Sequence, residues 1–497
     1  MSAHFARPDR HAALDGLNDR RMLRELAYVD GHWTAGDAGQ TFEVTDPASG
    51  AAIAWVSRLN AEQTSIAIDA AAKAFPLWRD LLPQERAAKL RRWHELILAA
   101  KDDLALIMTL EQGKPLAESR GEIDYAASFI EWYAEEAKRL NAENVTSHLR
   151  GAEMMMRREA IGVVGVVTPW NFPSAMLTRK AAAALAAGCT IVAHPSSETP
   201  LSALALAELA DRAGIPAGVF NIVTGSAATV VGRLCEDPRV RAMSFTGSTE
   251  IGRLIAAQCA PTMKTLVMEL GGHAPLIIFA DADMERAVSI AIDAKFATSG
   301  QDCLAANRIY VERSIHDAFA AAFTKRIAEL KVAPGLDQDA DIGPLMHERA
   351  VQKIEEQVED ALARGARCAI GGKRHKAGAL FYEPTLLTRV PDDSLIMREE
   401  TFGPVAAITA FDTEDEVVAR ANATEYGLVA YIVTRDGARM LRLGRRLDYG
   451  MVAINRVKIT GAPVPFGGIK QSGLGREGSR HGIEAFTELK YLCIDTH

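Results

Sequence analysis

Two residue types with the chemistry of covalent catalysis stand out in this chain. Cys303 lies in the segment Ser299–Ala305, and Glu269 lies 34 residues earlier in the segment Glu269–Gly272, which ends in two glycines. A thiol can attack a carbonyl carbon to form a covalent intermediate, and a carboxylate can activate the water that hydrolyses it. The pair therefore suggests covalent chemistry on a carbonyl followed by hydrolysis. Taken singly, each residue is more commonly structural.

Two further segments have the character of ligand-binding loops. Phe245–Gly252 follows an apolar run and opens a predicted helix, so that Gly247 allows close approach of a phosphate and Ser248 offers a donor at the helix N-terminus. Thr168–Pro173 also follows an apolar run, and its two prolines fix a loop that presents a tryptophan and an asparagine. The indole could cover a cofactor, and the amide could donate to a developing oxyanion.

Length, charge and cysteine usage exclude several classes of protein. A chain of 497 residues is too long for a single core and predicts two or three domains. A net charge of −8 disfavours nucleic acid as a partner, and no apolar run approaches the ~18–20 residues of a membrane span. The N-terminus does not resemble a secretory signal. The six cysteines include no CxxC pair, which disfavours a metal site and is typical of a reducing compartment such as the cytoplasm.

Strand-like and helix-like segments alternate through most of the chain. We expect a polar tail over residues 1–20, helices over 83–140 with Leu90, Trp93 and Ile97 on one face, and a β-hairpin near 144–159. Short apolar runs then predict parallel strands separated by helices, which indicates a doubly wound α/β sheet and, from Pro275, a second α/β pattern. The cysteines other than Cys303 are expected to be buried. The predicted strands are 163–167, 190–193, 219–223, 241–245, 265–269, 276–279, 308–311 and 489–494.

The four segments, taken together in this chain order, resemble the aldehyde dehydrogenase superfamily over essentially the full length. Within it the chain looks most like the succinate-semialdehyde dehydrogenases. Further matching segments are 109–118, 125–132, 399–404, 465–468 and 473–479. The resemblance implies an α/β, aldehyde dehydrogenase-like fold: a doubly wound dinucleotide-binding domain (21–142 and 161–271), an α/β catalytic domain (272–470) and a small β oligomerisation arm (143–160 and 484–497). It also implies a homodimer or homotetramer.

The resemblance further implies a mechanism. Cys303 attacks the aldehyde, Asn171 and the Cys303 backbone N–H hold the oxyanion, and Glu269 activates water to hydrolyse the thioester. Lys180 and Glu477 match positions that help relay the proton. The cofactor is NAD or NADP, and the positions that match its contacts are Thr168, Trp170, His194, Ser197, Gly225, Gly247, Ser248, Glu400 and Phe402.

Arg179 is the best clue to the substrate, because in the semialdehyde branch an arginine at this position meets the substrate carboxylate. Phe172 and Phe466 are expected to wall the same site. Ala297 replaces an arginine found in many semialdehyde relatives, and Arg456 or Lys458 could supply the missing anchor. The expected substrate is a short aldehyde with an anionic tail, similar to succinate semialdehyde. Glutarate semialdehyde and sulfolactaldehyde stay open as alternatives.

Three more departures from the family pattern bear on function. His194 stands where a lysine is usual, and Ser197 stands where NAD-specific relatives often have an acid, so that both nucleotides stay open. Asp302 is shared with some aminoaldehyde dehydrogenases and keeps an ω-aminoaldehyde as a further alternative; its charge should also raise the pKa of the Cys303 thiol. Ala305 removes a second cysteine found in some relatives. A CoA-acylating enzyme and a catalytically silent family member are the remaining alternatives.

Overall fold

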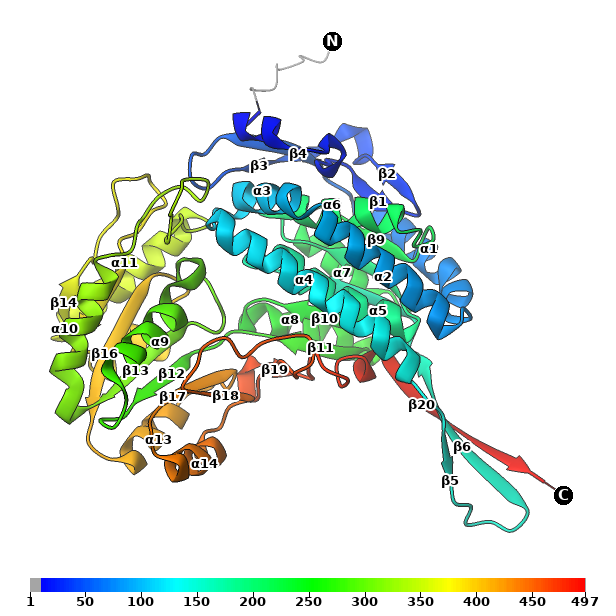
Figure 1. The fold of residues 1–497 in the computed structure, drawn as a ribbon. Coiled ribbons are helices and arrows are strands. Elements are labelled where there is room, and N and C mark those ends of the chain that lie inside the picture. Colours follow the sequence, from blue (N-terminus) through cyan, green and yellow to red (C-terminus); the bar gives the residue numbers. More distant parts are fainter. Residues whose placement is uncertain (1–9, 497) are drawn as a thin grey trace.

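The larger of the two main sheets has eight strands and draws on both ends and the middle of the chain (Figure 1). The structure is a computed structural model and describes residues 10–496. Five adjacent strands are parallel, and the flanking strands β19, β1 and β2 run antiparallel to their neighbours. In spatial order the strands are β19 (Gly473–Leu474), β11 (Thr265–Glu269), β10 (Val240–Thr246), β7 (Val163–Val167), β8 (Thr190–His194), β9 (Phe220–Ile222), β1 (Ala27–Val29) and β2 (His32–Thr34).

Helices cover both faces of this sheet. They are α1 (Ala61–Arg79), α2 (Pro83–Ala99), α3 (Lys101–Gln112), α4 (Leu116–Glu136), α5 (Pro173–Ala187), α6 (Pro200–Arg212), α7 (Ala227–Glu236) and α8 (Thr249–Cys259). Alternate residues of a strand point to opposite faces. Val164 and Val166 of β7 therefore join the core cluster with α2, α4, α5 and α6, whereas Val163 and Val167 join the cluster with α1, α7 and α8. A strand buried on both faces has to be apolar throughout, which explains the run that predicted it.

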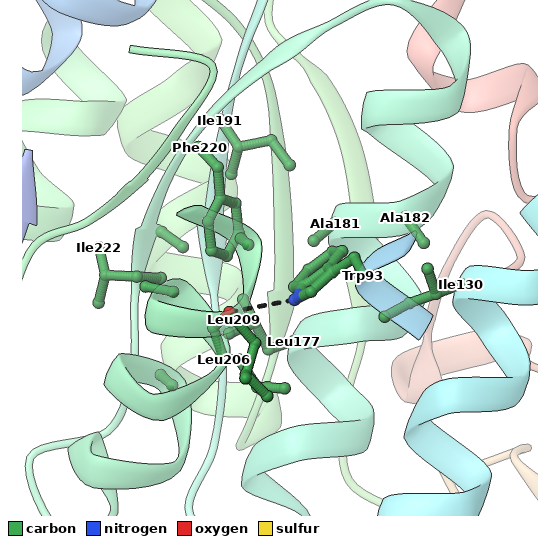
Figure 2. Packing of buried hydrophobic residues seen from close by; sticks show 14 of the residues in the cluster. Trp93, Ile130, Leu177, Ala181, Ala182, Ile191, Leu206, Leu209, Phe220 and Ile222 are labelled. Atoms are coloured by element: carbon green, nitrogen blue, oxygen red, sulfur yellow. Dashed lines mark hydrogen bonds between the residues drawn. The ribbon is translucent and has the colours of Figure 1, made fainter. Parts of the chain in front are cut away.

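The face of α2 that the sequence predicted packs against this sheet (Figure 2). Leu90, Trp93 and Ile97 are all buried, and the helix begins at Pro83 as predicted. The Trp93 indole N–H donates to the Leu206 carbonyl oxygen at 3.1 Å, which satisfies the polar end of a fully buried ring. The helical periodicity of 83–140 is thus confirmed as three helices that cover one face.

A second sheet of seven strands follows along the chain and is parallel except at β14. In spatial order its strands are β14 (Arg367–Ile370), β15 (Thr385–Thr388), β16 (Val405–Phe411), β13 (Ala306–Glu312), β12 (Ala274–Ile278), β17 (Val429–Val433) and β18 (Met451–Ile454). Its helices are α9 (Met284–Phe296), α10 (His316–Ile327), α11 (Glu348–Ala363), α12 (Leu395–Arg398), α13 (Glu414–Asn422) and α14 (Gly437–Arg446). The second α/β pattern is confirmed.

A three-stranded ribbon projects from the body of the molecule (Figure 1). It consists of β5 (Glu143–Val145), β6 (Ala152–Ala160) and β20 (Thr487–Asp495). β20 pairs antiparallel with β6 along its whole length, from Thr487 opposite Ala160 to Asp495 opposite Ala152. The predicted hairpin and terminal strand are therefore confirmed, and they pair with each other. A separate two-stranded sheet is formed by β3 (Thr41–Thr45) and β4 (Ala52–Ser57).

Two predictions about the chain were wrong. Residues 12–16 and 20–22 are short 3-10 helices rather than a tail, because the backbone N–H groups of Asn18 and Asp19 donate to the Asp103 carboxylate at 2.8 and 2.9 Å. The first nine residues of the expected tail lie outside the described part. Cys368 and Cys493 are exposed, because they lie on the edge strands β14 and β20, whereas the cysteines of the larger sheet and its helices are buried.

No helix in residues 10–496 is both long and apolar enough to cross a bilayer. Over the same residues, no three His, Cys, Asp or Glu side chains are grouped in a way that could hold a metal ion.

Candidate active site

Cys303 and Glu269 belong to segments of different sheets, and the backbones of these two segments touch. Glu269 is the last residue of β11 in the first sheet, and Cys303 lies in the loop between α9 and β13 of the second. A Cβ atom on Gly272 would lie 2.4 Å from the Cys303 carbonyl oxygen. Glycine at this position is therefore what allows the segment after the glutamate to touch the loop of the thiol.

The loop before Cys303 has an unusual backbone. Thr298, Ser299 and Gly300 have φ values of 49°, 56° and 72°, so three successive residues are in the left-handed region. The half-buried Glu118 carboxylate accepts the Thr298 backbone N–H at 3.0 and 3.1 Å, and a Cβ on Gly300 would lie 2.2 Å from the Gly403 carbonyl oxygen. Strain of this kind persists only where the surroundings over-determine it, and it is common at functional sites.

The thiol itself is half-buried and has a strongly perturbed pKa. Burial raises the pKa of Cys303 well above its ordinary value, and the charges of Asp302, Glu269 and Glu400 raise it further, while Arg179 lowers it. The predicted effect of the neighbouring aspartate is therefore confirmed in direction. The resting cysteine is a neutral thiol that needs help to ionise.

Asn171 is held beside this loop by contacts that the sequence did not reveal. Its side-chain amide donates to the carbonyl oxygen of Gln301, two residues before Cys303, at 3.1 Å. Its own carbonyl oxygen accepts from Lys114 Nζ at 2.6 Å, and this lysine forms a buried ion pair with Glu122, also at 2.6 Å. The other Glu122 oxygen caps the first turn of α5. Lys114 lay within a matched segment, but nothing marked it as a contact of Asn171.

A buried cluster of charges lies behind the glutamate. Lys180 Nζ donates to Thr246 Oγ1 at 2.6 Å and to the Glu477 carboxylate. The other oxygen of Glu477 forms an ion pair with Arg179 Nε at 2.5 Å. Backbone hydrogen bonds of 2.7 and 2.8 Å between Phe466 and Glu477 hold the C-terminal loop in this place. One carboxylate is therefore shared by two cations that are adjacent on α5.

The Arg179 guanidinium is fully buried but poorly supplied with acceptors. Its Nη2 donates to the Met176 thioether sulfur at 2.9 Å, and thioethers are weak acceptors. Its planar face lies 4.1 Å above the Phe466 ring. Burial alone would lower the pKa of Arg179, but the negative charges around it, Glu477 first and then Tyr125, Glu269 and Cys303, together outweigh burial and the net shift is upward. The group is thus a permanent cation with hydrogen-bonding capacity left over.

The pKa values of Glu269 and Glu477 are shifted in opposite directions. Burial, followed by the Glu477 charge, raises the pKa of Glu269 to about 8, although Arg179 and Lys180 act in the opposite direction. Burial also opposes ionisation of Glu477, but the same two cations hold the pKa of Glu477 below its ordinary value. The pair therefore has Glu477 ionised and Glu269 largely protonated at neutral pH, which is typical of groups that exchange protons during a reaction.

Five of the residues expected to hold the cofactor lie near this cluster. The Gly247 backbone N–H donates to the Glu269 carbonyl oxygen at 3.0 Å, and Ser248 caps the N-terminus of α8, where an anion is favoured. Glu400 accepts the Gly272 backbone N–H at 3.0 Å. The rings of Trp170 and Phe402 form an edge-to-face pair at 5.5 Å. A helix N-terminus, a carboxylate and two aromatic rings are groups that together fit a dinucleotide.

The residues expected at the adenosine end meet at the carboxyl ends of β7, β8 and β9. The Thr168 backbone N–H donates to the His194 carbonyl oxygen at 3.2 Å, and Ser197 Oγ donates to the Gly225 carbonyl oxygen at 3.4 Å. The Nδ1–H of the buried His194 ring donates to the Val223 carbonyl oxygen at 2.9 Å, and burial lowers the pKa of His194. The imidazole is therefore neutral at pH 7. Carboxyl ends of parallel strands are the usual ligand edge of such a sheet.

Two of the expected substrate residues take different positions from the rest. Phe172 precedes the first turn of α5, and its ring lies 4.1 Å below Lys114 Nζ. Arg456 follows β18, is exposed, and has no hydrogen bond or ion pair with any of residues 10–496. The structure thus brings Arg179 and Phe466 together, and places Arg456 outside their contacts.

The arrangement combines a thiol, an amide donor, a carboxylate with a pKa near neutrality and a dinucleotide edge, and comparison with known proteins identifies it. A model of the aldehyde dehydrogenase family matches residues 33–492. This chain belongs to that family. It is an NAD(P)-dependent aldehyde dehydrogenase that is similar to the succinate-semialdehyde dehydrogenases. The predicted family, fold and type of cofactor are therefore confirmed.

Three bacterial relatives illustrate the similarity. A non-phosphorylating aspartate-semialdehyde dehydrogenase of Halomonas elongata is 54% identical over 96% of this chain and 97% of its own. The NADP-dependent succinate-semialdehyde dehydrogenase of Escherichia coli is 51% identical over 96% and 99%. A glutarate-semialdehyde dehydrogenase of Pseudomonas aeruginosa is 52% identical over the same shares.

Solved structures agree with this assignment. A crystal structure of an NADP-dependent Escherichia coli enzyme superposes with a TM-score of 0.96 at 51% identity and covers 96% of this chain and 100% of its own. A betaine aldehyde dehydrogenase of Staphylococcus aureus in complex with NAD+ superposes with a TM-score of 0.93 at 34% identity and covers 95% and 98%.

Proposed function

We propose that this enzyme oxidises a short aldehyde with an anionic tail, and that Arg179 holds the anion. The observation that carries this proposal is the state of the guanidinium: it is buried and charged, it stacks on Phe466, and its Nη2 donates to the weakly accepting Met176 sulfur, with the Tyr125 hydroxyl as a further neighbour. A carboxylate is the ligand that matches unsatisfied guanidinium donors best, because it accepts two parallel hydrogen bonds.

The charge balance of the buried cluster supports an anion. Arg179 and Lys180 lie against one ionised carboxylate, Glu477, while a pKa of about 8 leaves Glu269 mostly neutral at pH 7. A local excess of positive charge attracts anionic tails and repels an ω-ammonium group. The relatives named above are named for aspartate, succinate and glutarate semialdehydes, each of which has a carboxylate at the end away from the aldehyde. We therefore place succinate semialdehyde and similar anions ahead of ω-aminoaldehydes.

The residues of the chain divide the reaction between them. Cys303 is the nucleophile and forms a thiohemiacetal with the aldehyde, and the Asn171 amide turns from Gln301 to the developing oxyanion. NAD(P)+, when bound, supplies the hydride acceptor. The resulting thioester is hydrolysed by a water molecule that Glu269 deprotonates. The proton then leaves through Lys180 and Glu477, which are already hydrogen-bonded to each other.

The nucleotide preference, the compartment and the assembly belong to the same proposal. Without an acid at Ser197, and with His194 neutral, we expect the enzyme to use both nucleotides. Free cysteines fit the reducing cytoplasm.

The unpaired edge of β20 carries the exposed Leu489, Tyr491 and Ile494, a surface suited to a homodimer or homotetramer. Light scattering of a Tyr491→Asp variant, which should shift towards the monomer, tests this assembly.

Kinetics of Arg179 variants test the substrate proposal. Arg179→Lys keeps the charge beside Glu477 but removes the fork, and we expect the KM for succinate semialdehyde to rise roughly tenfold to hundredfold, the loss of a charge-assisted hydrogen bond. The KM for propanal, which has no anion, should change little. Arg445→Ala, at an exposed arginine on α14, is the matched control. An unchanged KM for succinate semialdehyde in Arg179→Lys and Arg179→Met would refute the proposal.

A further inference from the structure

Asp302 is a carboxylate that the proposed reaction does not use. It directly precedes the nucleophile and is half-buried. Its Oδ1 accepts the Leu304 backbone N–H at 2.9 Å, and the Cys303 thiol is a second neighbour. Within residues 10–496 no lysine, arginine or histidine forms an ion pair with it. A carboxylate beside a reacting centre with no cation paired to it can take a cationic ligand, because opposite charges attract strongly in a partly buried site.

The Asp302 carboxylate makes ionisation of the neighbouring Cys303 thiol less favourable. Burial raises the pKa of Asp302, and after burial the Asp302 charge is the largest cause that raises the pKa of the Cys303 thiol. The backbone turn does not require the charge, because an asparagine oxygen could accept the Leu304 N–H equally well. A negative charge that hinders the nucleophile, and that the local fold does not need, indicates a function in recognition.

The position of Asp302 limits what it can recognise. Neighbouring Cα atoms lie only ~3.8 Å apart, so a group that meets Asp302 has to lie near the carbon that Cys303 attacks. A distant ω-ammonium would extend away from this point. An ammonium group on the second carbon from the aldehyde lies within reach, and a carboxylate on the same carbon would face Arg179. Both charges are then met by a residue of opposite sign.

We infer that Asp302 binds the ammonium group of a semialdehyde whose carboxylate is held by Arg179, which makes a short α-amino acid semialdehyde the preferred substrate class. This inference rests on the proposed function of Arg179 as the anchor of the anion. The bound ammonium would also offset the Asp302 charge and ease ionisation of the thiol. The other charged or titratable groups that act on Cys303 or Asp302 are Glu118, Glu269, Glu400, Lys114, Arg179 and Tyr431.

Steady-state kinetics on three substrates of one shape test this inference. They are L-aspartate semialdehyde, its 2-hydroxy analogue 2-hydroxy-4-oxobutanoate, and succinate semialdehyde, which has neither group. The wild type should show a kcat/KM for the amino substrate that exceeds the others by roughly tenfold or more, as expected for a charged hydrogen bond. Asp302→Asn should lose this advantage while it retains activity on succinate semialdehyde. Asp293→Asn, at an exposed aspartate on α9, is the control.

A second measurement separates recognition from a merely structural role. The rate of Cys303 alkylation by iodoacetamide, followed against pH, reports the pKa of the thiol, and Asp302→Asn should move this profile to lower pH. Equal kcat/KM values for the three substrates in the wild type, an equal loss on all three in Asp302→Asn, or a hydroxyl analogue as good as the amino substrate would each overturn the inference. Activity on succinate semialdehyde in those cases would leave the proposed function standing, whereas activity on propanal alone would remove both.

Discussion

The ionisation of Glu269 leads to a prediction about the hydrolytic half of the reaction. A general base acts only when it is deprotonated, and the pKa of Glu269 is about 8 because the group is buried and faces the Glu477 charge. Hydrolysis of the thioester should therefore accelerate as the pH rises through about 8. At pH 7 roughly a tenth of the enzyme would have the base available, so the rate constant should rise roughly tenfold between pH 7 and pH 9.5.

The charge of Glu477 provides the sharper perturbation. In Glu477→Gln the carboxylate that raises the Glu269 pKa is gone, while Arg179 and Lys180 remain and act on Glu269 without compensation. Charges at this range shift a pKa by about 1–3 units. The midpoint of the pH profile should thus move to lower pH by at least one unit, about 1.4 kcal/mol in the ionisation of Glu269, even if the plateau falls because the proton route is impaired.

A pH-jump assay separates thioester hydrolysis from the earlier steps, which depend on the ionisation of Cys303. The acyl-enzyme is formed from succinate semialdehyde and NADP+ at pH 6, the pH is raised, and loss of the thioester is followed by rapid quench and mass spectrometry. Glu269→Gln should accumulate the thioester at every pH, and Glu285→Gln, an exposed residue of α9, should behave as the wild type. A flat profile between pH 6 and 9 in the wild type, or an alkaline shift in Glu477→Gln, would refute the reasoning.

Three further predictions follow from single contacts. Asn171→Ala should reduce kcat by about 10²–10³-fold if the amide donates to the oxyanion, with the affinity for NADP unchanged by calorimetry; a loss below threefold would contradict that role. Gly300→Ala places a Cβ 2.2 Å from the Gly403 carbonyl oxygen at a φ of 72°, and should lower the free energy of unfolding by about 1–3 kcal/mol in urea melts and disturb Cys303, whereas Gly437→Ala, in open space, should not. His194→Lys should bind NADP about tenfold more tightly than the wild type, as expected for a charge added near a phosphate, with NAD less affected; equal gains for both nucleotides would contradict a contact with the 2′-phosphate.

Local pattern was sufficient for most of the secondary structure. The strands at 163–167 and 265–269 have the predicted bounds, because an apolar run is a property of neighbouring residues. The secondary-structure prediction was wrong where contacts with distant residues order the chain. Residues 12–22 are held by residues far along the chain: Asp103 accepts the Asn18 and Asp19 backbone N–H groups, and Leu14, Leu17 and Met22 are buried in the core. No local pattern records those contacts.

The residues of the candidate site show the same division. Their identities were available from the sequence, since a thiol, a carboxylate and an amide after strand-like runs suggest the chemistry. Their electrostatic states were not. Glu269 has a pKa of about 8 because it is buried and because the C-terminal loop brings the Glu477 charge near it. Arg179 has hydrogen-bonding capacity left because its Nη2 donates to a thioether sulfur and its plane stacks on the Phe466 ring.

The sequence by itself thus determined the family, the fold class and the reaction type, because these depend on residue types in a fixed order. The tertiary structure decided how the charges are shared: one carboxylate between two cations on α5, a protonated glutamate beside it, and an aspartate next to the nucleophile with no cation of its own. The physical reason is that a pKa depends on burial and on charges within a few ångströms, and in this chain the nearest charges come from residues hundreds of positions apart.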